Sequence, residues 1–261
     1  MPAFKFDANT RDYSRLNAYW LGQAALLTYQ DEAGVRAHVP TWGLNALSFF
    51  NQQETQAFIA GNDAMLILAF RGTTNLTDWM TDADIDLVGG PGGRVHEGFN
   101  VALNVVWREI WSFIREQRKG RALWVTGHSL GAALATLAVA KLRLEKDEPV
   151  NGLYTFGSPR AGDRDFARAF DADFERQTFR YVNNNDIVPR VPFRALHYSH
   201  VGTFKYFNNR GVQQEISWWD KIVDRVEGRI QELLEPGLDG IEDHGMTLYS
   251  ANLERALGSG Q

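Results

Sequence analysis

The spacing of apolar and polar residues along the chain predicts helices and short buried strands. Residues 14–29 place apolar side chains three and four positions apart, which is the pattern of a helix. Residues 46–70 are rich in β-favouring side chains and are interrupted at Gly61-Asn62-Asp63, which predicts short strands after that helix. Another helix is expected at residues 100–117, because its apolar positions repeat about every 3.6 residues and Gly120 follows.

The middle of the chain alternates between the two kinds of signal. Buried strands are predicted at residues 122–126, 153–156 and 179–182, and helices at residues 130–144 and 164–174. This alternation is typical of a parallel sheet with a helix after each strand. Because no linker divides the sequence, we expect one α/β domain over residues 1–261.

Composition narrows the classes of function. The chain has 261 residues, of which 44% are hydrophobic, so it can bury a full core. Its 27 basic and 32 acidic side chains are spread along the sequence and leave a net charge of -5, which argues against a nucleic-acid partner. The absence of cysteine excludes disulfides, thiolate metal sites and cysteine nucleophiles.

Neither a leader nor a membrane span is predicted. The start, Met1-Pro2-Ala3-Phe4-Lys5-Phe6-Asp7, lacks the apolar core of a secretory signal, and no stretch approaches the roughly 18 uncharged apolar residues of a transmembrane helix. The expectation is a cytoplasmic protein, or a secreted one whose leader has been removed. The oligomeric state is left open.

One short motif indicates a nucleophile. Gly127-His128-Ser129-Leu130-Gly131 has the form Gly-x-Ser-x-Gly and joins a predicted strand to a predicted helix. Such a turn presents the serine at the end of the strand, and the two glycines remove Cβ atoms that would collide. The Leu130 amide, at the N-terminus of the helix, would then face the oxyanion that forms during attack. A serine that only capped a core helix would not need both glycines.

A serine nucleophile requires a histidine that accepts its proton and a carboxylate that orients the histidine. On this kind of sheet the acid and then the histidine follow the serine along the chain, which leaves His197, His200 and His244. We favour His244, because it lies in a polar loop between two helical segments near the end of the sequence. The other two flank Tyr198-Ser199 before a predicted strand at residues 201–207 and are interpreted as structural.

The favoured acid is Asp186, in Asn183-Asn184-Asn185-Asp186-Ile187-Val188-Pro189. This loop follows the predicted strand at residues 179–182, and loops at the carboxyl ends of parallel strands collect functional residues. Three other carboxylates remain as alternatives: Asp163, Asp165 and Asp243. The first two fit turn or capping positions, and the third adjoins the candidate base too closely to bond its ring easily.

A second oxyanion donor is expected where another strand ends. The predicted strand at residues 65–70 runs into Arg71-Gly72-Thr73-Thr74, so the backbone amide and hydroxyl of Thr73 could face the same oxyanion. The alternative is a glycine turn with a capping threonine.

These motifs, taken together and in this order, resemble the class 3 lipases, the fungal Rhizomucor-type family. The resemblance covers residues 64–249 and also includes Val95-His96-Glu97-Gly98-Phe99 and Gly157-Ser158-Pro159-Arg160-Ala161-Gly162-Asp163. It implies an α/β-hydrolase fold with a predominantly parallel central sheet, helices on both faces and a short helical lid. It further implies a catalytic triad of Ser129, Asp186 and His244. The oxyanion hole would be formed by Thr73 and Leu130.

The lid of the family corresponds to residues 75–82 of this chain. Leu76, Trp79 and Met80 stand at positions i, i+3 and i+4, so one turn of helix would present an apolar face to an acyl chain. An ordinary amphipathic surface helix would have the same pattern.

The chain departs from the fungal pattern in an inserted, charged amphipathic helix at about residues 215–234. Trp218 and Trp219 could touch lipid there, although such a stripe is more often a core or dimer contact. The spacing of Asp82, Asp84 and Asp86 is that of the first three ligands of a calcium loop, but Leu87 and Gly93 stand where such a loop requires glycine and glutamate. The glycine-rich segment Gly89-Gly90-Pro91-Gly92-Gly93 lacks the spacing and the lysine of a phosphate-binding loop and is predicted to be a flexible connection.

The expected function is hydrolysis of carboxylic esters through an acyl-enzyme, without metal or organic cofactor, and the expected substrates are acylglycerols at a lipid–water interface. Alternatives of the same class are a short-chain or feruloyl-type carboxylesterase and a phospholipase A1. An alternative of another class is a catalytically silent acyl-binding protein, but such a protein would be expected to have lost a member of the triad.

Overall fold

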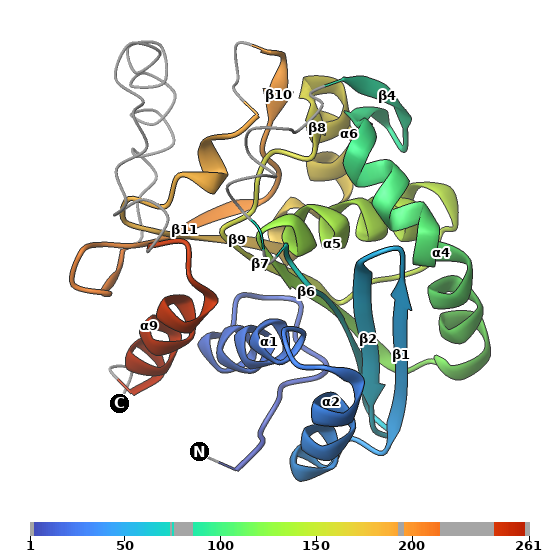
Figure 1. Ribbon diagram of the computed structural model, residues 1–261, viewed down its shortest axis with the longest axis vertical. Helices are drawn as coiled ribbons and strands as arrows, with labels where there is room; N and C mark the ends of the chain where they lie inside the picture. The colour runs from blue at the N-terminus through green and yellow to red at the C-terminus, as the bar shows by residue number, and fades with distance from the viewer. Residues whose placement is uncertain (1–2, 74, 76–85, 193–195, 215–242, 259–261) are drawn as a thin grey trace.

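An eight-stranded sheet forms the centre of the structure (Figure 1). The structure is a computed structural model, and it describes residues 3–73, 75, 86–192, 196–214 and 243–258. The strands of the sheet in chain order are β1 Ala46–Gln52, β2 Thr55–Gly61, β3 Met65–Phe70, β6 Ala122–His128, β7 Gly152–Phe156, β9 Thr178–Asn183, β11 Thr203–Phe207 and β12 Gln213–Gln214. The spatial order is the same as the order along the chain.

Strand direction changes only near the two edges of the sheet. The pairs from β3 to β6, β7, β9 and β11 are parallel, whereas β1, β2 and β3 pair antiparallel at one edge and β12 pairs antiparallel with β11 at the other. Parallel neighbours require a crossover connection, and the crossovers here place helices on the faces of the sheet. The predicted α/β architecture with a predominantly parallel sheet is therefore confirmed.

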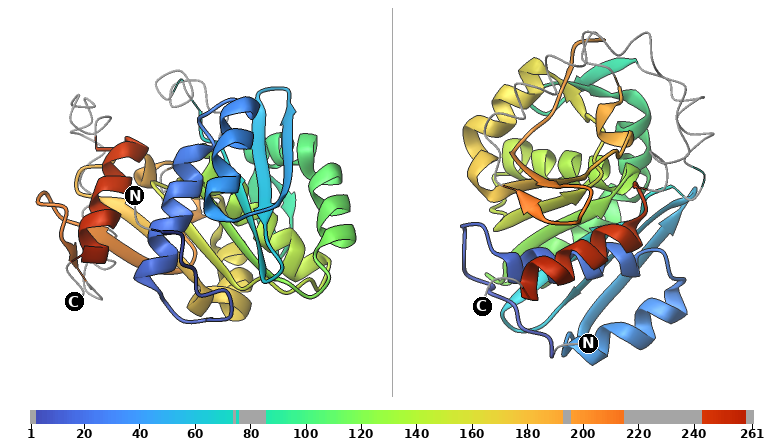
Figure 2. Two further views of the ribbon diagram at one scale, coloured as in Figure 1. Left: turned by 90° about the horizontal axis from the view of Figure 1, so that it is seen from below. Right: turned by 90° about the vertical axis from the view of Figure 1, so that its left-hand side faces the viewer.

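Helices cover both faces of the sheet (Figure 2). The helices α4 Glu97–Gln117, α5 Leu130–Ala140 and α6 Arg164–Phe174 contribute to one hydrophobic layer, and α1 Arg15–Leu27, α2 Glu32–His38 and α9 Met246–Gly258 contribute to the other. In β3, Leu66 and Leu68 pack into the first layer while Ile67 and Ala69 pack into the second. Helices α1 and α9, from opposite ends of the chain, lie side by side in both figures.

Local capping explains where two of the helices begin. The Ser14 side chain accepts a hydrogen bond from the Asn17 amide at the start of α1, and the Asp163 side chain accepts from the amides of Asp165 and Phe166 at the start of α6. Each cap satisfies backbone donors that have no partner inside the helix, which stabilises it by about 1 kcal/mol.

A second, smaller sheet lies beside the first and was not predicted. Its order is β10 Tyr198–Ser199, β8 Gly162–Asp163, β5 Gly93–His96 and β4 Leu87–Gly90, all antiparallel. The prediction of a flexible connection at residues 89–93 is wrong, because β4 and β5 form a hairpin that turns at Pro91 and Gly92. Its glycines serve the turn and the close packing: a Cβ on Gly93 would lie 2.2 Å from the Phe166 backbone nitrogen.

The predicted boundaries agree closely with the structure elsewhere. Helix α6 has the predicted bounds, α4 begins three residues earlier than predicted, and α5 continues into a π-helical turn at Lys141–Glu145. Most of the lid predicted at residues 75–82 lies outside the described residues, including Leu76, Trp79 and Met80. The predicted inserted helix with Trp218 and Trp219 lies outside them as well.

Candidate active site

Ser129 lies on a strained turn between β6 and α5. Its backbone has φ 58° and ψ -132°, a region that residues with a Cβ rarely adopt and that costs about 1–3 kcal/mol. A bond from the Ser129 amide to the Phe156 carbonyl oxygen, at 3.0 Å, holds the turn against the end of β7. The surrounding structure therefore maintains a conformation that the serine alone would not choose.

The glycines of the motif allow this turn to form. A Cβ on Gly127 would lie 2.2 Å from the Gly131 carbonyl oxygen, and a Cβ on Gly131 would lie 2.4 Å from the carbonyl oxygen of Phe70. Strand β6, helix α5 and the end of β3 can approach one another this closely only because both positions lack side chains. The steric argument drawn from the sequence is thus supported by the geometry.

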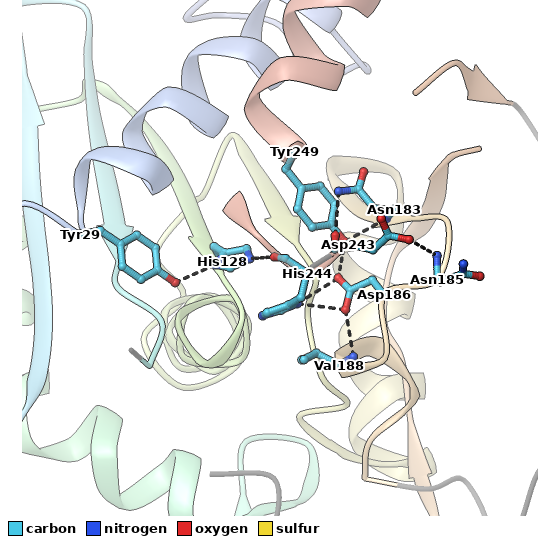
Figure 3. Close-up of polar contacts among 9 residues, drawn as sticks. All are labelled: Tyr29, His128, Asn183, Asn185, Asp186, Val188, Asp243, His244 and Tyr249. Atoms are coloured by element: carbon cyan, nitrogen blue, oxygen red, sulfur yellow. Dashed lines mark hydrogen bonds and ion pairs between the residues drawn. The ribbon is translucent and has the colours of Figure 1, made fainter. Parts of the chain in front are cut away.

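The structure brings Asp186 and His244 together (Figure 3). The distances from His244 Nδ1 to Oδ1 and Oδ2 of Asp186 are 2.9 Å and 3.0 Å, and both side chains are buried. The Val188 amide donates to Oδ1 at 2.9 Å, and the Tyr249 hydroxyl donates to Oδ2 at 2.6 Å. Because the carboxylate only accepts, His244 carries its proton on Nδ1 and leaves Nε2 free to accept another.

Hydrogen bonds between the two loops hold this pair in place. The Asn183 side-chain amide donates to the Asp243 carbonyl oxygen at 3.0 Å, and the Asn185 backbone amide donates to Oδ2 of Asp243 at 3.0 Å. The Tyr249 hydroxyl also accepts from the backbone amide of Asn183 at 2.9 Å. The loop after β9 and the segment before α9 are thereby joined directly beside the acid–base pair.

The alternative residues lie elsewhere or have other partners. His197 is exposed, the ring nitrogen Nε2 of His200 lies 2.7 Å from the Pro189 carbonyl oxygen, and Asp163 caps α6 as described above. Asp165 is an exposed residue beside Arg168. Asp243 contributes to the loop junction rather than to the imidazole of His244.

Two buried polar atoms of the candidate site have no hydrogen bond within the described part of the chain. They are the Ser129 hydroxyl oxygen and His244 Nε2, the pair between which a proton would move in a serine hydrolase. His128, the neighbour of Ser129, lies against the His244 ring with the ring centroids 4.5 Å apart. Such catalytic bonds are often incomplete until substrate binds.

The proposed oxyanion donors lie at adjacent strand ends. Leu130 is the first residue of α5, so its amide is among the helix N-terminal donors that have no intrahelical acceptor. Thr73 follows β3, is half-buried and accepts a bond from the Asn75 amide at 3.1 Å through its hydroxyl. A Cβ on the preceding Gly72 would lie 2.9 Å from the Ser129 Cβ, so this loop and the nucleophile are close neighbours.

Sequence reasoning did not identify the role of Tyr249. Tyr249 is five residues past His244 and looks like an ordinary core aromatic in the sequence. The spacing gives a weak signal, since a buried tyrosine usually finds a hydrogen-bond partner and the nearest candidate loop contains a carboxylate.

Among the described residues, no group of three or more acidic or histidine side chains is arranged to hold a metal ion.

Replacing Gly157 by alanine should disrupt the acid–base pair. Gly157 has φ +58°, and a Cβ there would lie 2.7 Å from Oδ2 of Asp186 and 2.8 Å from His244 Nδ1. We expect kcat to fall by about 100-fold, because a displacement of about 1 Å in a catalytic group is enough for such a loss.

Gly43→Ala is the matched control for that substitution. Steady-state kinetics would measure the activity of both variants, and thermal unfolding would measure their stability. Gly43 has φ +68° with open space around it, so Gly43→Ala imposes a similar backbone cost, about 1–2 kcal/mol, far from the site. Equal activities of the two variants would contradict the assigned position of the acid–base pair.

Removing the Tyr249 hydroxyl should lower turnover without weakening substrate binding. Tyr249→Phe deletes the donor to Oδ2 of Asp186, and a bond to a charged group contributes enough for about a tenfold loss in kcat. Tyr181→Phe is the control, because this buried hydroxyl donates to Tyr13 rather than to the acid. A Tyr249→Phe enzyme with the kcat of the Tyr181→Phe enzyme would exclude this role.

Comparison with known proteins places these features in one family. The model of the family Lipase (class 3) matches residues 67–196, about half of the chain. A triacylglycerol lipase of Ricinus communis is 30% identical over 304 residues, covering 80% of this chain and 58% of the relative. A secreted mono- and diacylglycerol lipase of Penicillium cyclopium is 36% identical over 157 residues, covering 57% of this chain and 50% of the relative.

The fold leads to the same family. The triacylglyceride lipase of Rhizomucor miehei superposes with a TM-score of 0.66 at 28% identity, covering 74% of this chain and 79% of that one. The central sheet and helices are thus those of an α/β-hydrolase, as the resemblance implied. The chain spans only 50% to 58% of the length of the two curated relatives described above. In sequence and in fold, the chain belongs to the class 3 lipase family.

Proposed function

We propose that this protein hydrolyses carboxylic esters of lipids, with Ser129 as nucleophile, His244 as general base and acid, and Asp186 as the residue that orients His244. The observation that carries the proposal is the buried His244–Asp186 pair, whose imidazole lies against His128, the residue before the strained Ser129, with the two ring centroids 4.5 Å apart. The sequence and fold of relatives named as acylglycerol lipases support it.

The mechanism follows from the hydrogen-bond capacities of these groups. His244 Nε2 accepts the Ser129 proton as the hydroxyl attacks the ester carbonyl, and Asp186 stabilises the imidazolium that forms. The amides of Leu130 and Thr73, with the Thr73 hydroxyl, stabilise the oxyanion. The imidazolium then protonates the leaving alcohol, and the neutral ring activates water to release the acid from the acyl-enzyme.

This mechanism predicts loss of activity in acid, since a protonated His244 cannot accept the serine proton. It requires no metal or organic cofactor, because each proton and charge is handled by a named side chain or amide.

Acylglycerols are the proposed substrates. Relatives named for action on triacylglycerols and on mono- and diacylglycerols support this choice. The apolar lid residues predicted from the sequence, Leu76, Trp79 and Met80, would contact the acyl chain. Within the described ranges, no helix combines the length and apolarity needed to cross a membrane. Access to a lipid–water interface, and the compartment in which the protein works, stay predictions.

Hydrolysis of p-nitrophenyl esters from acetate to palmitate tests the activity, and emulsified acylglycerols and phosphatidylcholine vesicles test the substrate class. We expect turnover to rise with acyl length and to be faster on acylglycerols than on phospholipid. Turnover of only the short soluble esters would indicate a carboxylesterase, and preference for the vesicles would indicate a phospholipase. A folded protein that hydrolyses none of them would instead be an acyl-binding protein.

A further inference from the structure

A second histidine lies in the site without serving as the proposed base. The Nδ1 atom of His128 lies 2.7 Å from the Tyr29 hydroxyl oxygen, and its Nε2 atom lies 2.7 Å from the backbone carbonyl oxygen of His244 (Figure 3). The partners are 99 and 116 residues away in the chain. The imidazole therefore bridges the end of α1, the nucleophile turn and the segment that carries His244.

The two partners determine which nitrogen of His128 carries the proton. A backbone carbonyl can only accept, so Nε2 must donate to the His244 carbonyl oxygen. In a neutral ring Nδ1 is then without a proton and accepts from the Tyr29 hydroxyl. Both nitrogens are occupied, so His128 has no free lone pair with which to accept the Ser129 proton.

The surroundings also keep His128 uncharged. Complete burial is the largest cause that holds the pKa of His128 well below its usual value, and the neighbouring His244 is the second. A neutral His128 matters because the ring centroid of His244 lies 4.5 Å away and that ring becomes an imidazolium during the reaction. A second positive charge at this distance would oppose the proton transfer.

Tyr29 extends the same network to the oxyanion loop. Its hydroxyl oxygen would lie 2.4 Å from a Cβ on Gly72, the residue before Thr73. Burial raises the pKa of Tyr29, so the hydroxyl stays protonated and donates a hydrogen bond to Nδ1 of His128. The loop that carries Thr73, the turn that carries Ser129 and the backbone of His244 thus meet at one tyrosine and one imidazole.

We propose that Tyr29 and His128 are positioning residues that clamp the His244 backbone, so that the Nε2 atom of the base faces Ser129 rather than rotating away. The proposal rests on the proposed function. It differs from a general packing role because it assigns a donor, His128 Nε2, and an acceptor, the His244 carbonyl oxygen, to the orientation of the base.

Tyr29→Phe tests the outer bond of the clamp. The substitution keeps the ring and removes only the donor to His128, and we expect kcat to fall by about tenfold with KM within about twofold, since an orienting bond acts on the chemical step. Tyr154→Phe is the matched control, because Tyr154 belongs to the same hydrophobic layer but its hydroxyl accepts from the Ser14 amide at 3.0 Å. Equal kcat in the two variants would overturn the role of Tyr29.

His128→Leu and His128→Gln test the inner bond. Leucine fills the space without a donor, and we expect a loss in kcat of about 100-fold, whereas glutamine can place an N–H near the position of Nε2 and should restore about tenfold of that loss. Thermal unfolding shows whether each variant is folded. If folded leucine and glutamine variants are equally active, the bond from Nε2 does not orient the base.

A measurement independent of activity separates this proposal from the proposed function. In Ser129→Ala protein, the ¹⁵N chemical shifts of the His128 ring should report a neutral imidazole with the proton on Nε2 from pH 8 down to about pH 5, below the ordinary range of histidine titration. A proton on Nδ1, or titration of His128 in this range, would overturn the clamp even if the protein is an active lipase. If the His128 ring shows the predicted tautomer but the wild-type protein hydrolyses no ester, the clamp stands and the proposed function fails.

Discussion

Replacing Ser129 by alanine should lower kcat for ester hydrolysis by about 10⁵- to 10⁶-fold, as the loss of the nucleophile does in other serine hydrolases. The residual rate would come from the oxyanion donors at Thr73 and Leu130 and from substrate binding, which the substitution leaves intact. KM should change little. Folding should be nearly unaffected, because alanine meets the same backbone cost at φ 58° as serine.

The nearby Ser158 supplies the control for that loss. Its side chain is buried and donates to the Pro159 carbonyl oxygen at 3.0 Å, so Ser158→Ala removes a serine hydroxyl from the same region without touching the proposed chemistry. Its kcat should lie within about threefold of the wild type, as expected for loss of a single neutral hydrogen bond. A Ser129→Ala enzyme as active as Ser158→Ala would remove the basis of the proposed function.

Asp186→Asn should lower kcat by about 10⁴-fold, the loss expected when the orienting carboxylate of a triad becomes an amide. Both carboxylate oxygens accept from other donors, Oδ1 from the Val188 amide and Oδ2 from the Tyr249 hydroxyl. Either orientation of an asparagine side chain therefore turns its NH₂ group toward a donor. The imidazole of His244 loses its acceptor or takes the wrong tautomer.

Asp163→Asn is the informative comparison, because Asp163 was an alternative acid in the sequence. It caps α6, and asparagine caps helices about as well as aspartate, so the protein should fold and retain most of its activity. Steady-state kinetics with a soluble p-nitrophenyl ester would measure both variants. If Asp163→Asn were the inactive variant, the acid would be wrongly assigned.

The elements with strong local patterns could be predicted from the sequence. Helix α6 and the strands β6, β7 and β9 lie close to the predicted positions, because each combines a clear apolar period with capping or turn residues at its ends. The small sheet could not be predicted in this way. Its strands β8 and β10 are two residues long, too short to show an alternation of apolar and polar residues. The hairpin of β4 and β5 was missed because its glycine-rich turn is typical of a flexible connection.

The candidate site shows a similar division. Ser129, Asp186 and His244 could be proposed because each lies in a recognisable loop at the end of an element, and chain order restricted the choice. The clamp of Tyr29 and His128 could not be proposed from the sequence, because His128 contacts residues that are 99 and 116 positions away. The part played by Tyr249 depends likewise on a contact across 63 positions, which local sequence patterns do not encode.

Covalent labelling tests the central claim, that Ser129 is the nucleophile, most directly. A fluorophosphonate traps an activated serine by forming a stable ester with its oxygen, and peptide mass spectrometry locates the modified residue. We predict one adduct per chain, on Ser129, and no adduct in the Ser129→Ala and Asp186→Asn proteins under the same conditions. Labelling of another serine, or a folded wild type that is not labelled at all, would contradict the account.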